Sequence, residues 1–205
     1  MCAELAHGFE VLSPVRRGVA VFGSARTPED APAYAQGREI GRALGEAGFC
    51  VITGGGPGAM EAANRGARDA GAHSIGLGID LPFEQGLNPY VDTAVDFHYF
   101  FARKVMFVRY SNAFVVLPGG FGTMDELFEA LTLIQTRKIR YFPVVLVGSA
   151  FWGGLVDWVR DTMLGAGNIS PRDLTLLRVT DSVDEVVSIC TAAAERQLAE
   201  DPRSA

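Results

Sequence analysis

The sequence predicts an α/β fold in which a Rossmann-like, doubly wound and mostly parallel sheet carries helices on both faces. Short β-branched runs alternate with longer stretches of helical spacing, which is the pattern of successive βαβ units. Three of the short runs end in turns that open a helix, as strands do in nucleotide-binding folds. No repeat, linker or low-complexity tract interrupts the chain, so we expect a single domain over residues 1–205.

The expected elements follow from these patterns in chain order. Strands are predicted at the apolar, β-rich runs 19–23, 49–53, 74–79, 95–99, 113–117 and, as the last clear strand, 143–147. Helices are predicted where apolar residues recur at helical spacing, at 32–48, 59–70, 101–110, from the glycine turn at 118–123 to about 137, 151–163 and 182–198. The tails, 1–13 and 201–205, are expected to be disordered.

Charge and composition restrict the possible partners. The 18 basic and 24 acidic residues give a net charge of −6, which opposes nucleic acid or an anionic membrane as the main partner because both bind basic surfaces. No apolar run approaches a membrane span, and residues 1–17 lack the apolar segment of a signal peptide, so we expect a cytoplasmic protein. The cysteines and histidines show no metal-ligand spacing. We therefore expect no metal, and buried free thiols at Cys50 and Cys190.

The glycine turn Gly54-Gly-Gly-Pro-Gly-Ala59 follows the second predicted strand. It satisfies G-x-G-x-x-A, and Asp80 follows the next strand, so an NAD-dependent oxidoreductase is one interpretation. That fingerprint normally opens the first βα unit, whereas this turn comes one unit later. A smaller anion is an alternative ligand, because glycine lets an anion approach the backbone amides.

A second turn, Pro118-Gly-Gly-Phe-Gly-Thr-Met-Asp-Glu126, is more informative. It lacks the Lys-Ser/Thr of a nucleoside-triphosphate loop, so we expect the amides of Gly119–Thr123 and the Thr123 hydroxyl to bind one phosphate. The structural alternative is a capping box, in which Glu126 reaches back to a helix that begins at Thr123. A capping box does not explain the preceding glycines or the adjacent Asp125.

The pair Arg103-Lys104 lies in a stretch, 100–108, that is apolar on nearly every side. A helix of this kind is buried, and a buried cation needs an anionic partner. Glu126 or a ligand phosphate would serve. Because one sheet cannot cover such a helix all round, we expect a homo-oligomer with this helix at the subunit contact. Alternatively, the predicted helices at 151–163 and 182–198 of the same chain cover this helix.

Together these segments resemble the LONELY GUY (LOG) family, the cytokinin riboside 5′-monophosphate phosphoribohydrolases. The family pattern P-G-G-x-G-T-x-x-E is matched from Pro118 to Glu126, and its R-K pair is matched at Arg103-Lys104. Its G-G-G-x-x-G/A-M turn is matched at Gly54–Met60, and Phe22-Gly-Ser-Ala25 is also similar. The resemblance covers residues 19–147. Asp125 replaces the commoner Glu, and Glu61 follows the turn where Gly is common. Both departures bear on base specificity more than on the reaction.

The resemblance implies hydrolysis of AMP or an N6-substituted adenosine 5′-monophosphate to the free purine and ribose 5-phosphate, as in cytokinin biosynthesis, with no cofactor. Members are often labelled lysine decarboxylases, but no pyridoxal phosphate site is recognisable in this sequence. The resemblance implies Arg103 and Glu126 as the catalytic residues, and it implies a homodimer or larger assembly. The substrate site that it implies consists of Ser24, Gly54, Gly55, Gly56, Met60, Glu84, Lys104, Gly119, Gly120, Gly122, Thr123, Asp125 and Thr132.

The chemistry of the implied reaction suggests roles without assigning them. Breaking the N9–C1′ bond gives the ribose oxocarbenium-like character, which a carboxylate beside C1′ stabilises. Glu126 therefore has three possible roles: stabilising this charge, holding the ribose hydroxyls or activating water. Arg103 orients Glu126 or stabilises the departing purine. The competing interpretation is a non-catalytic carrier of a nucleotide or a phosphorylated, molybdopterin-type cofactor, but the presence of both Arg103 and Glu126 favours an enzyme.

Overall fold

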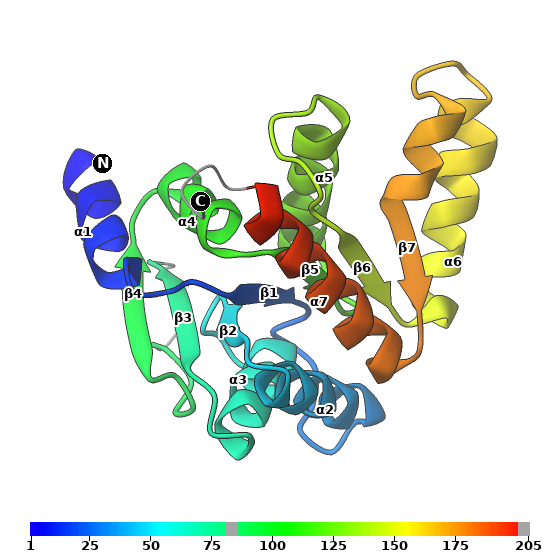
Figure 1. The fold of residues 1–205 in the computed structure, drawn as a ribbon. Helices are drawn as coiled ribbons and strands as arrows, with labels where there is room; N and C mark the ends of the chain where they lie inside the picture. The colour runs from blue at the N-terminus through cyan, green and yellow to red at the C-terminus, as the bar shows by residue number, and fades with distance from the viewer. Residues whose placement is uncertain (81–85, 201–205) are drawn as a thin grey trace.

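The computed structural model describes residues 1–80 and 86–200 of the chain. Seven strands form one sheet in the order β4-β3-β2-β1-β5-β6-β7 (Figure 1), and every neighbouring pair is parallel. This arrangement confirms the predicted α/β class. The strands are β1 (Gly18–Phe22), β2 (Cys50–Thr53), β3 (Ser74–Ile79), β4 (Thr93–Phe97), β5 (Ala113–Val116), β6 (Val144–Val147) and β7 (Leu177–Thr180).

Helices cover both faces of the sheet, as a doubly wound fold requires. One core contains Met106, Leu127 and Trp152, and the other contains Ile40 and Cys190. Helices α4, α5 and α6 therefore pack on one face, and α2, α3 and α7 on the other. Their bounds are α1 (Cys2–Leu12), α2 (Pro32–Glu46), α3 (Ala59–Asp69), α4 (Phe100–Tyr110), α5 (Phe121–Gln135), α6 (Ser149–Trp158) and α7 (Val183–Glu200), with a π-helical segment at Val159–Leu164 and a 3₁₀ segment at Pro171–Leu176.

The strand order reverses direction at β1. From β1 the chain builds β2, β3 and β4 on one side, then crosses to β5, β6 and β7 on the other. In open parallel sheets this reversal creates a crevice at the carboxyl ends of the strands. The turns that follow β1, β2 and β5 consequently meet at one place, and these are the three turns that the sequence singles out.

The expectation of a disordered segment at 1–13 is wrong. Helix α1 packs on α4, and Leu12 at its end is fully buried in the core. A Cβ on Gly8 would lie 2.9 Å from the Met106 methyl carbon, and the Tyr110 hydroxyl donates to the Phe9 carbonyl at 3.2 Å. The apolar side of α4 needs a cover, and α1 supplies it. The predicted closing helices do not take this part, since α7 packs against α2 on the opposite face and α6 packs on β6 and β7.

Strand β7 is absent from the prediction, which ended the sheet at residues 143–147. It is a four-residue edge strand with an exposed Arg178, so it has no continuous apolar run to mark it. Cys190 is buried as expected, and burial raises the pKa of its thiol to about 12; Cys50 is only half-buried. Residues 201–205 lie outside the described part. Within the described part, no helix combines the length and apolar character needed to cross a membrane.

Candidate active site

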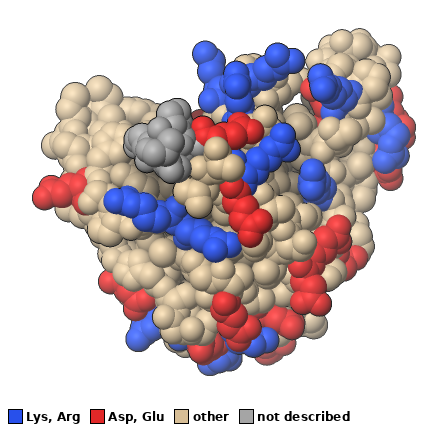
Figure 2. Space-filling view, in the orientation of Figure 1, with Lys and Arg blue, Asp and Glu red and all other residues tan. Residues whose placement is uncertain are grey.

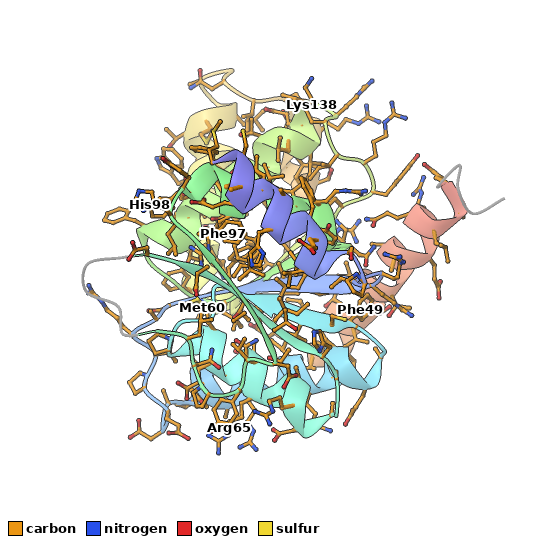
Figure 3. The ribbon with its side chains drawn as sticks, turned by 90° about the vertical axis from the view of Figure 1, so that its left-hand side faces the viewer. Phe49, Met60, Arg65, Phe97, His98 and Lys138 are labelled. Atoms are coloured by element: carbon orange, nitrogen blue, oxygen red, sulfur yellow. The ribbon has the colours of Figure 1, made fainter. Side chains whose placement is uncertain are left out.

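Three turns meet at the carboxyl edge of the sheet, and Ser24 links them. Its backbone N–H donates to the Pro118 carbonyl at 3.0 Å, and its carbonyl accepts from the Ala59 N–H at 2.9 Å. Gly58 has φ of +68°, and a Cβ there would lie 2.5 Å from the Ser24 oxygen. Figure 3 shows Met60, Phe97 and His98 toward this edge and Phe49, before β2, at the opposite one. The turns therefore form one continuous surface.

The first glycine turn, Gly54–Gly58, is filled by side chains of the protein itself. A Cβ on Gly54 would lie 2.2 Å from Arg103 Nη2 and 2.8 Å from Met60 Sδ. Gly55 has φ of +74°, and a Cβ there would lie 2.1 Å from Leu87 Cδ2. Packing and backbone conformation thus require glycine here. Because the protein occupies the space above these glycines, this turn is a poor site for a dinucleotide pyrophosphate.

Arg103 lies against that turn and reaches it from α4. Its Nε donates to the carbonyl of Leu77, in the second half of β3, at 2.8 Å. Its guanidinium carbon lies 5.2 Å from the centre of the Phe107 ring, within the range of a cation–π interaction. The structure therefore places a permanent positive charge over the carboxyl ends of β2 and β3.

The second glycine turn, Pro118–Gly122, opens α5. The helix begins at Phe121 with Gly120 as its N-cap residue, and no side chain caps it. Thr123 is therefore the third helical residue, and Glu126 lies farther along, so the capping-box alternative is wrong. The first amides of a helix have no partner within the helix, and the positive end of the helix dipole favours an anion in front of them.

Two glycines of the second turn have no structural explanation within the chain. A Cβ built on Gly120 or on Gly122 would meet nothing within 4 Å, and neither residue has a positive φ. Gly119 differs, because its Cβ would lie 2.1 Å from the Thr123 hydroxyl oxygen. The fold itself would thus accept a side chain at Gly120 and Gly122.

Glu126 is a buried carboxyl group on α5, with 7% of its surface exposed. Burial raises its pKa to about 7, and the nearby charges of Lys104 and Arg103 oppose this rise. Carboxyl groups with a strongly shifted pKa are concentrated at functional sites. Because the carboxyl is buried and lies beside two cations, it can exist in either protonation state near neutral pH.

Lys104 binds two carboxylates of α5 that the sequence analysis did not pair with it. Its Nζ lies 2.8 Å from Asp125 Oδ2 and 2.6 Å from Glu129 Oε2. Burial lowers the pKa of Lys104, but these two hydrogen bonds, together with the negative charges of Glu126 and Glu129, outweigh burial and raise it. Glu126, the partner expected from the sequence, acts on Lys104 only through space. Glu129 was missed, although its i, i+4 spacing from Asp125 places both carboxylates on one helix face.

A cavity of about 490 Å³ adjoins the first glycine turn at the ends of β3 and β4. This volume suits a small-molecule ligand. Its walls include Gly54, Gly56 and Gly78, together with the polar side chains of Glu4, Asp96 and His98. The sequence analysis missed these three polar residues because they come from two distant segments, α1 and the end of β4, and form no local motif. Another hollow, of about 470 Å³, lies on the surface of α2 and α3 among residues such as Arg38 and Asp69, away from the glycine turns.

The sequence of this chain is similar to those of known proteins. A family model described as "Possible lysine decarboxylase" matches residues 60–190. A cytokinin riboside 5′-monophosphate phosphoribohydrolase of Mycobacterium tuberculosis is 32% identical over 179 residues, which span 84% of this chain and 92% of that protein. The chain belongs to this LOG family.

Solved structures share the LOG-family fold of this chain. One is a structural-genomics target named TM1055, with a TM-score of 0.66, 26% identity, and coverage of 86% of this chain and 99% of that one. Another is a molybdenum cofactor carrier protein from Chlamydomonas reinhardtii, with a TM-score of 0.63, 27% identity, and coverage of 87% and 97%. An enzyme and a carrier protein are thus both similar to this chain.

Most of the LOG-type residues predicted from the sequence lie together at the three turns. Two do not join them. Glu84 lies outside the described residues. Thr132 is six residues, or about 9 Å along the helix, beyond Glu126 on α5, and its hydroxyl donates to the Phe128 carbonyl at 2.8 Å. Within one chain Thr132 therefore does not reach the second glycine turn.

Proposed function

We propose that this LOG-family chain hydrolyses the N-glycosidic bond of AMP and N6-substituted adenosine 5′-monophosphates, and so releases the purine and ribose 5-phosphate. The observation that carries this proposal is the second glycine turn. There, helix-start amides adjoin two glycines, Gly120 and Gly122, that the fold does not require, and buried Glu126 follows on the same helix. The name of the mycobacterial relative supports the same reaction.

The second glycine turn binds the 5′-phosphate in this proposal. Glycine at positions 120 and 122 leaves room for phosphate oxygens to approach the amides of Gly119–Thr123. The Thr123 hydroxyl is an additional donor. Phosphate bound there is remote from the reacting bond, so its binding energy orients the ribose rather than taking part in the chemistry.

Glu126 and Arg103 act at the reacting bond. The C1′–N9 bond breaks, its electron pair leaves with the purine, and C1′ gains oxocarbenium character. Ionised Glu126 stabilises this positive charge and accepts a proton from the water that adds to C1′. Arg103 stabilises the negative charge that develops on the leaving purine. The purine then takes up a proton from solvent, and Glu126 releases to solvent the proton that it accepted. The cavity at the ends of β3 and β4 receives the base.

The competing function is a carrier that binds a phosphorylated, molybdopterin-type cofactor without chemical change. The similarity to the Chlamydomonas carrier favours it. Both functions need a phosphate site, but only hydrolysis needs a buried carboxyl whose pKa lies near neutrality.

Incubation with AMP distinguishes the two functions. We expect chromatography to detect adenine and ribose 5-phosphate in equal amounts, and kcat/KM for adenosine to be at least about 100-fold lower because it lacks the phosphate. ADP and ATP should also react poorly. AMP that binds without release of adenine would favour the carrier. Equal turnover of adenosine and AMP would contradict the phosphate assignment.

We also propose a homodimer that forms through apolar side chains near the second glycine turn. Phe101 and Val105 of α4 are 49% and 44% exposed, and Phe121 of α5 is 96% exposed. The Lys104–Asp125 ion pair joins α4 to α5, so these apolar groups lie on neighbouring helices, and an exposed apolar patch marks an interaction surface. Phe107, in contrast, belongs to the core and packs edge-on against Phe22 at 4.8 Å, so it takes no part in a contact between copies.

Three statements remain predictions from the sequence: the single domain over 1–205, the cytoplasmic location and the absence of a nucleic-acid partner. The last is supported by the surface charge. On the face drawn in Figure 2, acidic and basic side chains are interspersed over much of the surface, and the net charge of the chain is −6. A nucleic-acid backbone favours a continuous basic surface.

A further inference from the structure

We propose that Asn88 is a positioning residue for this reaction: its buried side-chain amide fixes the first glycine turn, against which the Arg103 guanidinium lies. The proposal rests on the role given to Arg103 above. Asn88 follows β3 in the chain and belongs to none of the motifs that the sequence analysis singled out.

Asn88 binds the first glycine turn through three hydrogen bonds. Its Nδ2 donates to the Gly55 carbonyl at 3.0 Å and to the Gly56 carbonyl at 3.1 Å. Its backbone N–H donates to the Gly55 carbonyl at 2.7 Å. Its Oδ1 accepts from the Tyr90 N–H at 3.1 Å, which holds the side chain in place. The side chain is buried, so these bonds do not compete with water.

A second layer of buried polar groups holds this arrangement. Asn64 of α3 accepts through Oδ1 from Asn88 Nδ2 at 3.0 Å and from the Thr53 hydroxyl at 2.6 Å. The Asn64 Nδ2 donates to the Ser74 hydroxyl at 2.8 Å, and the Thr53 hydroxyl accepts from the Gly55 N–H at 2.8 Å. Such networks fix one geometry, because a shifted member leaves a buried polar group unpaired. The amide that binds the Gly55 and Gly56 carbonyls is therefore itself fixed by Asn64 of α3.

The turn is in direct contact with Arg103. Gly54 precedes the two residues that Asn88 binds, and a Cβ there would lie 2.2 Å from Arg103 Nη2. A displacement of the turn therefore changes the position of the guanidinium. Misplacement of a catalytic group by about 1 Å lowers a rate by roughly 100-fold. Asn88 thus affects catalysis through the turn and without touching the substrate.

The phosphate end lies apart from this network, because Ser24 links the two turns at Pro118 and Ala59 and not at Gly55 or Gly56. The second glycine turn follows β5, and β5 is separated from β2 by β1, a distance of about 10 Å across the sheet. Loss of the Asn88 bonds should therefore impair turnover and leave binding of ribose 5-phosphate intact.

The test is Asn88→Asp, which preserves shape and the acceptor for Tyr90 but replaces the amide that donates to Gly55, Gly56 and Asn64 with a carboxylate oxygen, which only accepts. We expect kcat for AMP to fall by roughly 10- to 100-fold, with KM and the inhibition constant of ribose 5-phosphate within about twofold of wild type. Asn112→Asp is the matched control. Asn112 accepts from the Gly18 N–H at 3.1 Å and donates to Gln197 Oε1 at 2.7 Å, at the amino edge of the sheet, so kcat should be unchanged.

A kcat of Asn88→Asp within twofold of wild type would overturn the proposal. So would a parallel loss of ribose 5-phosphate binding, which would indicate general damage. If Asn88→Asp does not fold, Asn88→Ser gives the same comparison of kcat with KM, because a serine hydroxyl cannot span both carbonyls.

A measurement without substrate separates this proposal from the proposed function. The Nε–H signal of Arg103 in NMR spectra, identified by its loss in Arg103→Lys, reports the bond to the Leu77 carbonyl. We expect its exchange with water to be at least about tenfold faster in Asn88→Asp and unchanged in Asn112→Asp. An unchanged signal in Asn88→Asp would refute the positioning role. A wild-type protein that hydrolyses no nucleoside monophosphate would refute only the proposed function.

Discussion

The two glycine turns look alike in the sequence but differ in the reason for their glycines. In the first turn, Arg103 and Leu87 occupy the space that a Cβ on Gly54 or Gly55 would need. In the second turn, nothing lies within 4 Å of a Cβ on Gly120 or Gly122. A run of glycines before a helix therefore does not by itself indicate a ligand. Glycines without a neighbour in the folded chain leave room for a partner from outside, and at Gly120 and Gly122 that room lies beside the free amides at the start of α5.

The same contrast extends to the residues behind each turn. Uncharged amides and hydroxyls of Asn64, Asn88 and Thr53 hold the first turn, whereas a buried carboxyl, Glu126, follows the second. The first region is built for fixed geometry, and the second retains a group that can exchange a proton. Each prediction below tests this difference.

The largest effect is expected for Glu126→Gln. We expect kcat/KM for AMP to fall by about 10³-fold, because glutamine lacks the charge needed at C1′. The free energy of unfolding of the variant, in contrast, should be higher than that of the wild type. The folded chain raises the pKa of Glu126 from 4.5 to about 7, so the stability that its neutral form provides is complete below pH 4.5 and is lost as pH rises through 7.

At pH 8 the variant should therefore have a free energy of unfolding roughly 3 kcal/mol above that of the wild type, and this gain should shrink toward pH 4. Adenine release and chemical denaturation at both pH values measure the two effects. A variant that stays active, or that is less stable at pH 8, would show that Glu126 has a structural role.

Alanine substitutions in the two turns should have opposite effects. Gly55→Ala places a Cβ at φ of +74° against Leu87 and should lower the free energy of unfolding by about 2 kcal/mol. Gly122→Ala lies in the first turn of α5 and should raise it by about 0.5–1 kcal/mol, while KM for AMP rises roughly 10- to 100-fold as the phosphate site is obstructed. Destabilisation by both substitutions would remove the distinction between the turns.

The pH dependence of kcat/KM should follow Glu126. Because ionised Glu126 is the active form, kcat/KM should rise with pH around a midpoint near 7 and fall about tenfold for each pH unit below it. Asn88→Asp should lower kcat/KM at every pH without moving this midpoint, because the network that holds the first turn fixes the position of Arg103 and does not set the pKa of Glu126. Initial rates between pH 5 and pH 9 in both proteins provide the test, and a flat profile would exclude Glu126 as the base.

The smallest change in activity is expected for Val105→Asp, a substitution in the proposed contact between subunits. Light scattering should give twice the 21.9 kDa mass of the chain, and Val105→Asp should reduce it to a single chain because an unpaired carboxylate is costly in an apolar contact. Phe151→Asp is the control, since Phe151 on α6 has a similar exposure of 46% and should leave the mass unchanged. A wild-type mass near 22 kDa would contradict the homodimer.

Local patterns explain which parts of the fold were predictable. The strands and helices around the three turns followed from apolar runs and glycine positions, since each signal lies within about ten residues. Helix α1 was missed although Leu5, Gly8 and Leu12 recur at helical spacing, because Glu4, His7 and Glu10 interrupt its apolar residues and it lies at the end of the chain. Strand β7 gave little signal, because an edge strand needs few apolar residues.

The site was predictable where a motif carries the chemistry. Arg103 lies against the first glycine turn and its charge acts on Glu126, whereas the catalytic and binding roles of these residues stay predictions. The network around Asn88 was not predictable, because its partners Asn64 and Gly55 lie 24 and 33 residues away and only the sheet order brings them together. Hydrogen-bond partners at such separations produce no periodic pattern in the sequence, so they can be recognised only from the tertiary structure.

Helix α1 also has a practical consequence for work with this protein. Glu4 borders the cavity and accepts from the Tyr99 N–H at 3.4 Å, so the first residues of the chain lie beside the cavity that we propose to receive the base. An affinity tag fused ahead of Met1 would sit beside that opening, whereas a tag after Ala205 would follow α7, which packs on the opposite face of the sheet. Assays of base preference should therefore use protein tagged at the carboxyl end, or protein from which an amino-terminal tag has been cleaved.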